Sequence, residues 1–162
     1  MTVPPAAEDM AGGIRPLLAI DGDSFAHRSF HALPKSIRRR DGTGGGAIVG
    51  FANVLVRLFE SEQPRAVVVA WDTLDTPNFR QRLFPPYQGS RDFDPELVDQ
   101  LAILPEFVTA CGFTSAKAPG LEADDFLAAA VTAEERRGGT TLVATGDRDA
   151  FQLASAHTTI LH

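Results

Sequence analysis

Short apolar runs alternate along the chain with segments whose apolar residues recur at helical spacing. The runs cover 16–20, 66–71, 141–144 and, more weakly, 158–161, and we predict a β-strand for each of them. Near-continuous apolar runs of this length are typical of strands that are covered on both faces. The pattern therefore predicts a central, mostly parallel sheet.

Three segments between these runs have the pattern of amphipathic helices. The first, 47–59, follows the glycine run 44–46 and is closed by Pro64. The second opens at Asp94, an acidic N-cap followed by proline, and runs to Gly112. The third starts after Gly120 and ends at the glycines 138–139. Strands that alternate with helices in this way predict an α/β three-layer domain.

Two segments fall outside this pattern. Residues 73–93 are rich in proline, arginine and aromatic residues, and they are too long for a plain connection inside a compact domain. We expect a functional segment there. Residues 1–14 carry acids but no lysine or arginine before position 15, and we expect them to be a disordered leader to a domain that covers 15–162.

The composition is that of one globular domain. The chain has 162 residues, of which 44% are hydrophobic, and such a length buries roughly 70% of its unfolded surface without disulfides. The single cysteine, Cys111, lies in an apolar run, and we expect a buried thiol in a reduced, cytoplasmic protein. No run approaches the roughly 20 apolar residues of a membrane span, so we expect no membrane partner.

The net charge of −6 at first argues against a nucleic-acid partner, because lysine and arginine dominate phosphate binding. The acids, however, gather where the predicted strands end. Asp21 ends the first strand, Asp72 ends the second, and Asp147 and Asp149 follow the third. Ligands of open parallel sheets bind outside the carboxyl ends of the strands, so these acids should converge on one crevice.

A further acidic group lies in the first turn of the third helix. Glu122 and Asp125, three residues apart, should share one helix face, while Asp124 should point elsewhere and reach a second position or a water molecule. Each acid alone has an ordinary structural explanation, as a helix cap or a turn residue. Taken together, the seven carboxylates predict a site for Mg²⁺ or Mn²⁺, and two such ions can cleave a phosphodiester.

Several of these residues occur in motifs that resemble a known family, the bacterial 5′→3′ exonucleases with their flap-endonuclease-like 5′-nuclease domain. The similarity covers about 15–162, and its motifs are Ile20–Gly22, Ala26–Leu33, Gly50–Phe51, Asp72 with Phe79–Arg80, Tyr87 with Arg91, Pro119–Asp125, and Thr145–Asp149 with Gln152–Leu153.

The resemblance implies a PIN-like fold and divalent-metal hydrolysis of DNA at 5′ ends and flaps, in replication or repair. It implies a monomer in the bacterial cytoplasm and allows a DNA polymerase as a partner. Arg28 should lie near the scissile phosphate, and we expect Arg28 and Arg80 to act as catalytic residues that offset the charge developing on it. The segment of about 73–93, with Arg80, should form a helical arch that admits the single-stranded 5′ end. The metal ligands carried over are Asp21, Asp72, Glu122, Asp124, Asp125, Asp147 and Asp149. The DNA-binding residues, from the resemblance and from a basic run at 38–40, are Arg28, Arg38, Arg39, Arg40, Arg80, Arg82, Tyr87 and Arg91.

The chain departs from the family pattern at two places. Gln88 stands where members usually have a lysine, and the sequence stops at His162, before the family's remaining acids and its helix-hairpin-helix-like element, so we expect a fragment. Two other functions stay open. Asp21 with Asp23 fits the Asp-x-Asp pair of a haloacid-dehalogenase-type phosphatase, and a non-catalytic nucleic-acid-binding module is the second. A PIN-type ribonuclease would use the same metal chemistry.

Overall fold

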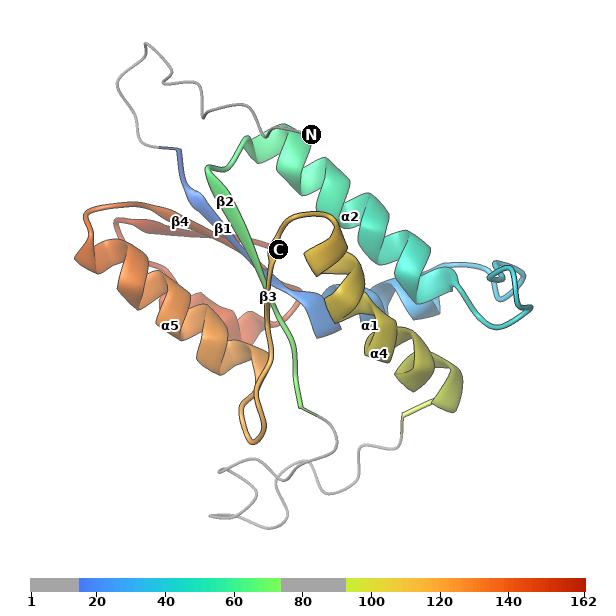
Figure 1. Cartoon of the computed structure of the whole chain (residues 1–162). Helices are drawn as coiled ribbons and strands as arrows, with labels where there is room; N and C mark the ends of the chain where they lie inside the picture. Colours follow the sequence, from blue (N-terminus) through green and yellow to red (C-terminus); the bar gives the residue numbers. More distant parts are fainter. Residues whose placement is uncertain (1–14, 74–92) are drawn as a thin grey trace.

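The computed structural model describes residues 15–73 and 93–162 (Figure 1). The leader expected at 1–14 and nearly all of the arch expected at 73–93 lie outside the described residues. The described chain builds a five-stranded parallel sheet in the order β3-β2-β1-β4-β5. Its strands are β1 Leu17–Asp21, β2 Ala66–Ala70, β3 Thr114–Ala116, β4 Thr141–Ala144 and β5 Thr158–Leu161.

The four predicted strands and their parallel pairing are confirmed, and β3 was not predicted. Its three residues, Thr114, Ser115 and Ala116, are too few and too polar to show an apolar run. The strand forms because the chain after the second predicted helix pairs with β2, from Val68 opposite Thr114 to Ala70 opposite Ala116.

Helices cover both faces of the sheet, which confirms the three-layer α/β architecture. In Figure 1, α5 (Ala123–Arg136) lies on one side, and α1 (Gly22–Ala32), α2 (Gly46–Glu62) and α4 (Pro95–Ala110) lie on the other. Two apolar clusters match these layers. The larger joins α1, α2 and α4 to the sheet and contains Phe51 and Trp71, and the smaller packs Leu127 and Val131 of α5 against the other face.

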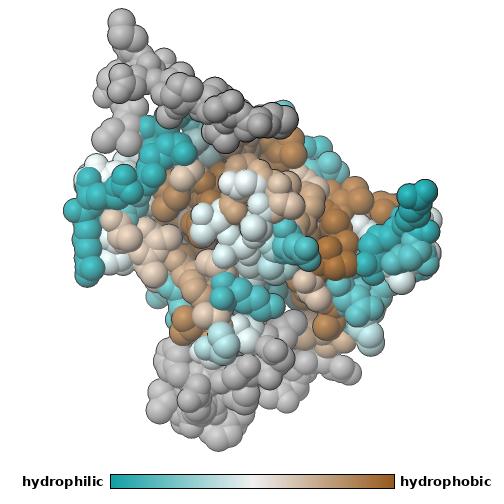
Figure 2. All heavy atoms as spheres, viewed as in Figure 1, coloured by the Kyte–Doolittle hydropathy of each residue, from teal (hydrophilic) through white to brown (hydrophobic). Residues whose placement is uncertain are grey.

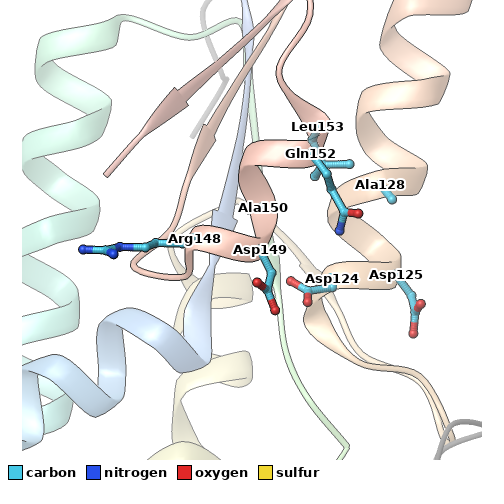
Figure 3. A pocket seen from close by; sticks show the side chains of 8 residues that line it. All are labelled: Asp124, Asp125, Ala128, Arg148, Asp149, Ala150, Gln152 and Leu153. Atoms are coloured by element: carbon cyan, nitrogen blue, oxygen red, sulfur yellow. The ribbon is translucent and has the colours of Figure 1, made fainter.

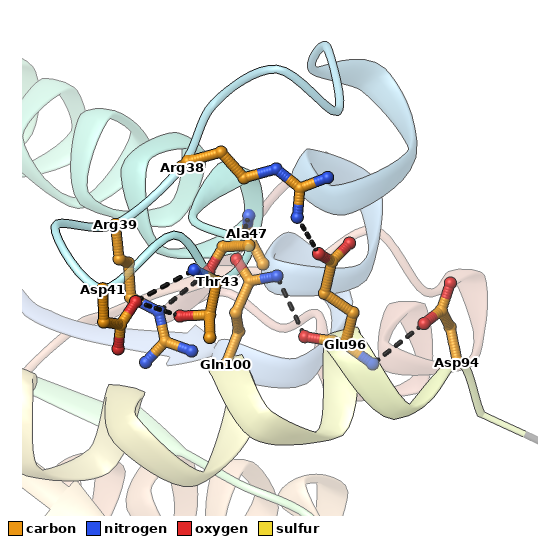
Figure 4. Close-up of polar contacts among 9 residues, drawn as sticks. Arg38, Arg39, Asp41, Thr43, Ala47, Asp94, Glu96 and Gln100 are labelled. Atoms are coloured by element: carbon orange, nitrogen blue, oxygen red, sulfur yellow. Dashed lines mark hydrogen bonds and ion pairs between the residues drawn. The ribbon is translucent and has the colours of Figure 1, made fainter.

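The first turn of α2 is held by a side chain from α4. The N-cap of α2 is Gly45, which has no side chain to accept from the first helical amides. Gln100, 1% exposed, supplies the missing acceptor, because its Oε1 accepts from the amide of Ala47 at 2.8 Å (Figure 4). The start of α4 is itself capped by Asp94, which accepts from the amide of Glu96. The two helices are therefore fixed to each other near the point where the described chain resumes.

The expectation of a buried cysteine was wrong, since Cys111 is exposed. The buried stripe of α4 ends at Val108, and Cys111 is the C-cap in the turn beyond it, before Gly112 with φ +86°. Figure 2 shows apolar side chains on the surface over α2 and α4. Val56 of α2 and Val98 of α4 are exposed. Within 15–73 and 93–162, no helix is both long and apolar enough to cross a membrane.

Candidate metal centre

The parallel register brings the acids of the strand ends to one edge of the sheet. Asp21, the last residue of β1, pairs with Ala70 of β2, and Ile20 pairs with Ala144 of β4. Asp72 follows the end of β2 by two residues, and Asp147 follows the end of β4 by three. Electrostatic repulsion from both Asp72 and Asp147 reaches Asp21, so the strand-end acids do converge on one region.

Asp21 is the most firmly held of these acids. It is 6% exposed, and both of its carboxylate oxygens accept hydrogen bonds. The amide of Ser24 donates to Oδ1 at 3.0 Å, and the hydroxyl of Thr145 donates to Oδ2 at 2.8 Å. Burial is the main cause that raises the pKa of Asp21, and the neighbouring negative charges add to it. The fold therefore fixes this carboxylate in one orientation at an electrostatic cost.

Two hydroxyl groups tie the loop after β4 to the start of α1. Thr145, fully buried, also accepts from the amide of Asp147 at 3.0 Å, and Ser24 accepts from the amide of Gly146 at 3.0 Å. Gly146 is packed so closely that an added Cβ would lie 2.6 Å from Nη1 of Arg28. The guanidinium of Arg28 thus lies against the β4 loop, next to the acids.

A further buried acid, Asp23, holds the end of β2. Its Oδ2 accepts from the amide of Asp72 at 2.6 Å, and the residue is 9% exposed. Burial, followed by the charge of Asp72, raises the pKa of Asp23 to about 7. Asp72 in turn accepts from the amide of Ala123 through Oδ1 at 2.8 Å, at the N-terminus of α5. Asp23 therefore links α1, β2 and α5 through one chain of contacts.

In the first turn of α5, Glu122 and Asp125 lie together and Asp124 points to a different side, as their spacing predicts. Asp125 takes a capping role, because its Oδ2 accepts from the amide of Glu122 at 3.0 Å. Asp124, which we expected to point elsewhere, interacts electrostatically with Asp21, Asp72, Asp147 and Glu122, and burial together with these charges raises its pKa to about 6. Figure 3 shows the carboxylate of Asp124 directed toward Asp149, with Asp125 directed away from both.

A hollow opens beside this turn, between α5 and the short 3₁₀ helix η1 (Arg148–Leu153). Asp124, Asp149 and Gln152 are among the residues that line it (Figure 3). Asp149 donates its amide to Oδ1 of Asp147 at 2.9 Å, and both acids are exposed. The exposed side of the acid cluster therefore faces solvent space that a substrate can enter.

The acids lie close enough to interact electrostatically, but they do not form a complete set of metal ligands. Among the residues that the structure describes, no three Asp, Glu, His or Cys side chains stand where they could hold a metal ion together. Several of the oxygens accept hydrogen bonds from Ser24, Thr145 and Ala123. The donor chemistry nevertheless suits a hard divalent cation, because a positive charge would offset the neighbouring negative charges that help to raise the pKa values of Asp21 and Asp124.

Two of the three arginines in the basic run 38–40, which follows α1, make contacts within the fold. Arg38 forms an ion pair with Glu96 of α4, and Nε of Arg39 donates to the carbonyl of Gly44 at 3.0 Å (Figure 4). Arg40 is exposed. The other predicted DNA-binding residues of the arch lie outside the described residues; they are Arg80, Arg82, Tyr87 and Arg91.

The sequence analysis missed the supporting residues of this site. Ser24 carried no signal, and Thr145 was noted only as the first residue of a family motif, because only the contact between β1 and β4 shows that their hydroxyls face the acids. Asp23 was considered only as a phosphatase acid. Its spacing from Asp21, two residues on within the first turn of a helix, was the one sequence feature that could have placed it in the cluster.

Comparison with known proteins adds independent findings. Residues 16–162 match the model of a family described as 5′-3′ exonuclease, N-terminal resolvase-like domain. DNA polymerase I of Mycobacterium tuberculosis is 38% identical over 148 residues, which is 90% of this chain and 16% of that protein. The thermostable DNA polymerase I of Thermus thermophilus is 36% identical over 147 residues, 90% of this chain and 17% of that protein. The chain thus spans about a sixth of the length of these relatives.

Solved structures share the fold. The 5′-exonuclease of phage T5 with bound zinc ions aligns with a TM-score of 0.68 and 16% identity, covering 91% of this chain and 55% of that one. The phage T5 flap endonuclease, in a complex with DNA and metal ions, aligns with a TM-score of 0.66 and 19% identity, covering 91% and 54%. At these identities the likeness extends to the fold, which is the PIN-like 5′-exonuclease fold.

Proposed function

Since this chain belongs to the 5′-3′ exonuclease family, through its N-terminal resolvase-like domain, we propose that it cleaves DNA as a divalent-metal-dependent 5′→3′ exonuclease and flap endonuclease. The substrate is DNA with a 5′ end or a 5′ flap, and the cations are two Mg²⁺ or Mn²⁺ ions. We place this activity in replication or repair, in the bacterial cytoplasm, in a monomer that works with a DNA polymerase.

The meeting of acids from four parts of the fold carries this proposal. Besides burial, the pKa of Asp124 on α5 is raised by the charges of Asp21 at the end of β1, Asp72 after β2 and Asp147 after β4. Such a concentration of negative charge destabilises a fold unless cations or protons offset it. A site for divalent cations is the function that explains why the fold retains it.

The residues present suit such cations. Asp21, Asp72, Asp124 and Asp147 would hold them, with Glu122, Asp125 and Asp149 as further ligands, directly or through water. When bound, the ions supply activation of water and stabilisation of the leaving oxygen of a phosphodiester. Ser24 and Thr145 keep the carboxylate of Asp21 in place, and Arg28 offsets charge on the phosphate from the β4 side.

Two alternative functions, a phosphatase and a non-catalytic binding module, fit the acid cluster less well. In a haloacid-dehalogenase-type phosphatase, Asp23 would have to act on the substrate, yet its Oδ2 accepts from the amide of Asp72 and the side chain is 9% exposed. A non-catalytic nucleic-acid-binding module would need no cluster of buried acids, and these acids would weaken its contact with phosphate.

Cleavage of a 5′-labelled flap duplex tests the proposal. We expect short 5′ products in Mg²⁺ or Mn²⁺ and none in EDTA, with the rate lowered by about 10- to 100-fold or more in Asp124→Asn. Asp99→Asn is the matched control, because it removes the same charge from an exposed position on α4. It should cleave at the rate of the unchanged chain.

Each alternative has its own outcome in this experiment. Metal-dependent DNA binding without product from either a flap or a recessed 5′ end would support the binding module. A fluoroberyllate adduct on Asp21 would support the phosphatase. Cleavage of RNA in preference to DNA of the same sequence would support a ribonuclease.

A further inference from the structure

Lys117 lies on the β3 side of the acid cluster, whereas Arg28 lies on the β4 side. It is the residue after β3, and the amide of Trp71 donates to the carbonyl of the preceding Ala116 at 3.0 Å. The hydroxyl of Thr73 donates to the carbonyl of Ala118 at 2.6 Å. These two contacts on either side of Lys117 hold its backbone beside the segment that carries Asp72.

The ammonium group of Lys117 is available to a ligand. The residue is exposed, and among the described residues it has no hydrogen bond or ion pair. Its charge nevertheless reaches Asp23, the buried acid that accepts from the amide of Asp72. Lys117 is therefore within electrostatic range of Asp23, and it forms no ion pair with an acid among the described residues.

The strand order places the acids between two cations. Lys117 follows β3, Asp72 follows β2, Asp21 ends β1, and Arg28 lies against the loop after β4. Neighbouring strands are about 4.8 Å apart, so the cationic positions at β3 and β4 are separated by three spacings, or about 14 Å. A negatively charged polymer that crosses the acids would meet a positive charge on each side.

Phosphate recognition needs such flanking charges here. The acids repel a nucleic-acid backbone, and the metal ions offset that repulsion only at the reacting phosphate. Phosphates on either side must be attracted by side chains, and lysine is suited to this as a compact charge on a flexible stem.

We propose that Lys117 is a phosphate-binding residue of this site, which contacts the DNA backbone on the β3 side of the acids while Arg28 contacts it on the β4 side. This inference rests on the proposed nuclease function and assigns a further part of its substrate site. It makes the β3–α5 loop a DNA contact.

Binding of a fluorescent flap duplex to the full chain tests the inference. Anisotropy is measured with Ca²⁺ in place of Mg²⁺, over a range of salt concentrations, for the unchanged chain, Lys117→Ala and Lys117→Arg. Arg136→Ala is the matched control, because it also removes one exposed positive charge but lies at the far end of α5 from the acids. Thermal melting of each variant confirms that it is folded.

We expect Lys117→Ala to lower affinity roughly tenfold at low salt and to reduce the slope of log K against log salt by about 1. Lys117→Arg should retain the slope, and Arg136→Ala should change neither quantity. If folded Lys117→Ala binds with the slope of the unchanged chain, the inference is overturned while the proposed function stands. If the unchanged chain does not bind flap DNA at all, both are overturned.

Discussion

Replacing Thr145 by valine should destabilise the protein far more than the loss of one hydroxyl suggests. The substitution keeps the shape of the side chain but removes a donor to Oδ2 of Asp21 and an acceptor for the amide of Asp147. Thr145 is 0% exposed and its hydrogen bond to Asp21 is buried, so water cannot replace that donor. Asp21 would then be a buried carboxylate with one of its two oxygens deprived of the hydroxyl donor.

The size of the effect follows from these two contacts. A hydrogen bond to a charged group contributes about 1.5–3 kcal/mol, and one between neutral groups about 1 kcal/mol. We therefore expect Thr145→Val to lower the free energy of unfolding by about 2–4 kcal/mol. Thr145→Ser, which keeps the hydroxyl, should lose much less, although it leaves a small cavity in place of the methyl group.

Urea denaturation followed by circular dichroism measures this difference. Thr132→Val is the control, since Thr132 is exposed and its hydroxyl donates only to the carbonyl of Ala128 in its own helix. We expect this variant to stay within about 0.5 kcal/mol of the unchanged chain. The reasoning is refuted if Thr145→Val and Thr132→Val are equally stable, because the link between β1 and the β4 loop would then contribute nothing.

Three further predictions concern the same region. In EDTA, the raised pKa values of Asp21, Asp23 and Asp124 mean that the folded chain binds more protons than the unfolded chain between about pH 4 and pH 7, so the melting temperature should fall as pH rises through this window. Adding Mg²⁺ at about 100 times its Kd at pH 7.5 should stabilise the fold by about 2.7 kcal/mol for each ion bound, measured by urea denaturation, and EDTA should reverse this. Gly22→Ala should lower the free energy of unfolding by about 1–3 kcal/mol, because its Cβ would lie 2.5 Å from the buried ring of Trp71.

Each of these has an outcome that contradicts it. Asp23→Asn should flatten the dependence of melting temperature on pH, and an unchanged slope in this variant would show that other groups cause it. If Mg²⁺ stabilised Asp124→Asn as much as the unchanged chain, Asp124 would be excluded as a metal ligand. Gly46→Ala is the control for Gly22→Ala, because the nearest atom to its added Cβ would be Cβ of Leu33, at 3.7 Å. If both variants lost the same free energy of unfolding, the contact with Trp71 would be excluded as the cause.

The order of apolar runs and acids along the chain was enough to predict the layers of this protein and the edge of the sheet at which its acids meet. Apolar runs define β1, β2 and β4 locally, and the edge strand β5 more weakly, because a strand buried on both faces must be apolar at consecutive positions. Acids that follow such runs must lie at the carboxyl edge once the strands are parallel. Neither inference depends on how any side chain is oriented.

Which of the side chains at that edge face one another, and which cap a helix or accept from a backbone amide, depends on tertiary contacts. Asp124 and Asp125 are neighbours in one helical turn, and their spacing predicts that they point to different sides but not which side faces the strand-end acids. The packing of α5 against the sheet directs Asp124 to these acids and leaves Asp125 as a cap. The roles of Asp23 and Thr145 depend on contacts with residues 49 and 124 positions away in the chain. Local periodicity carries no information about such distant partners, so the hydrogen bonds that fix the acids could be found only in the folded chain.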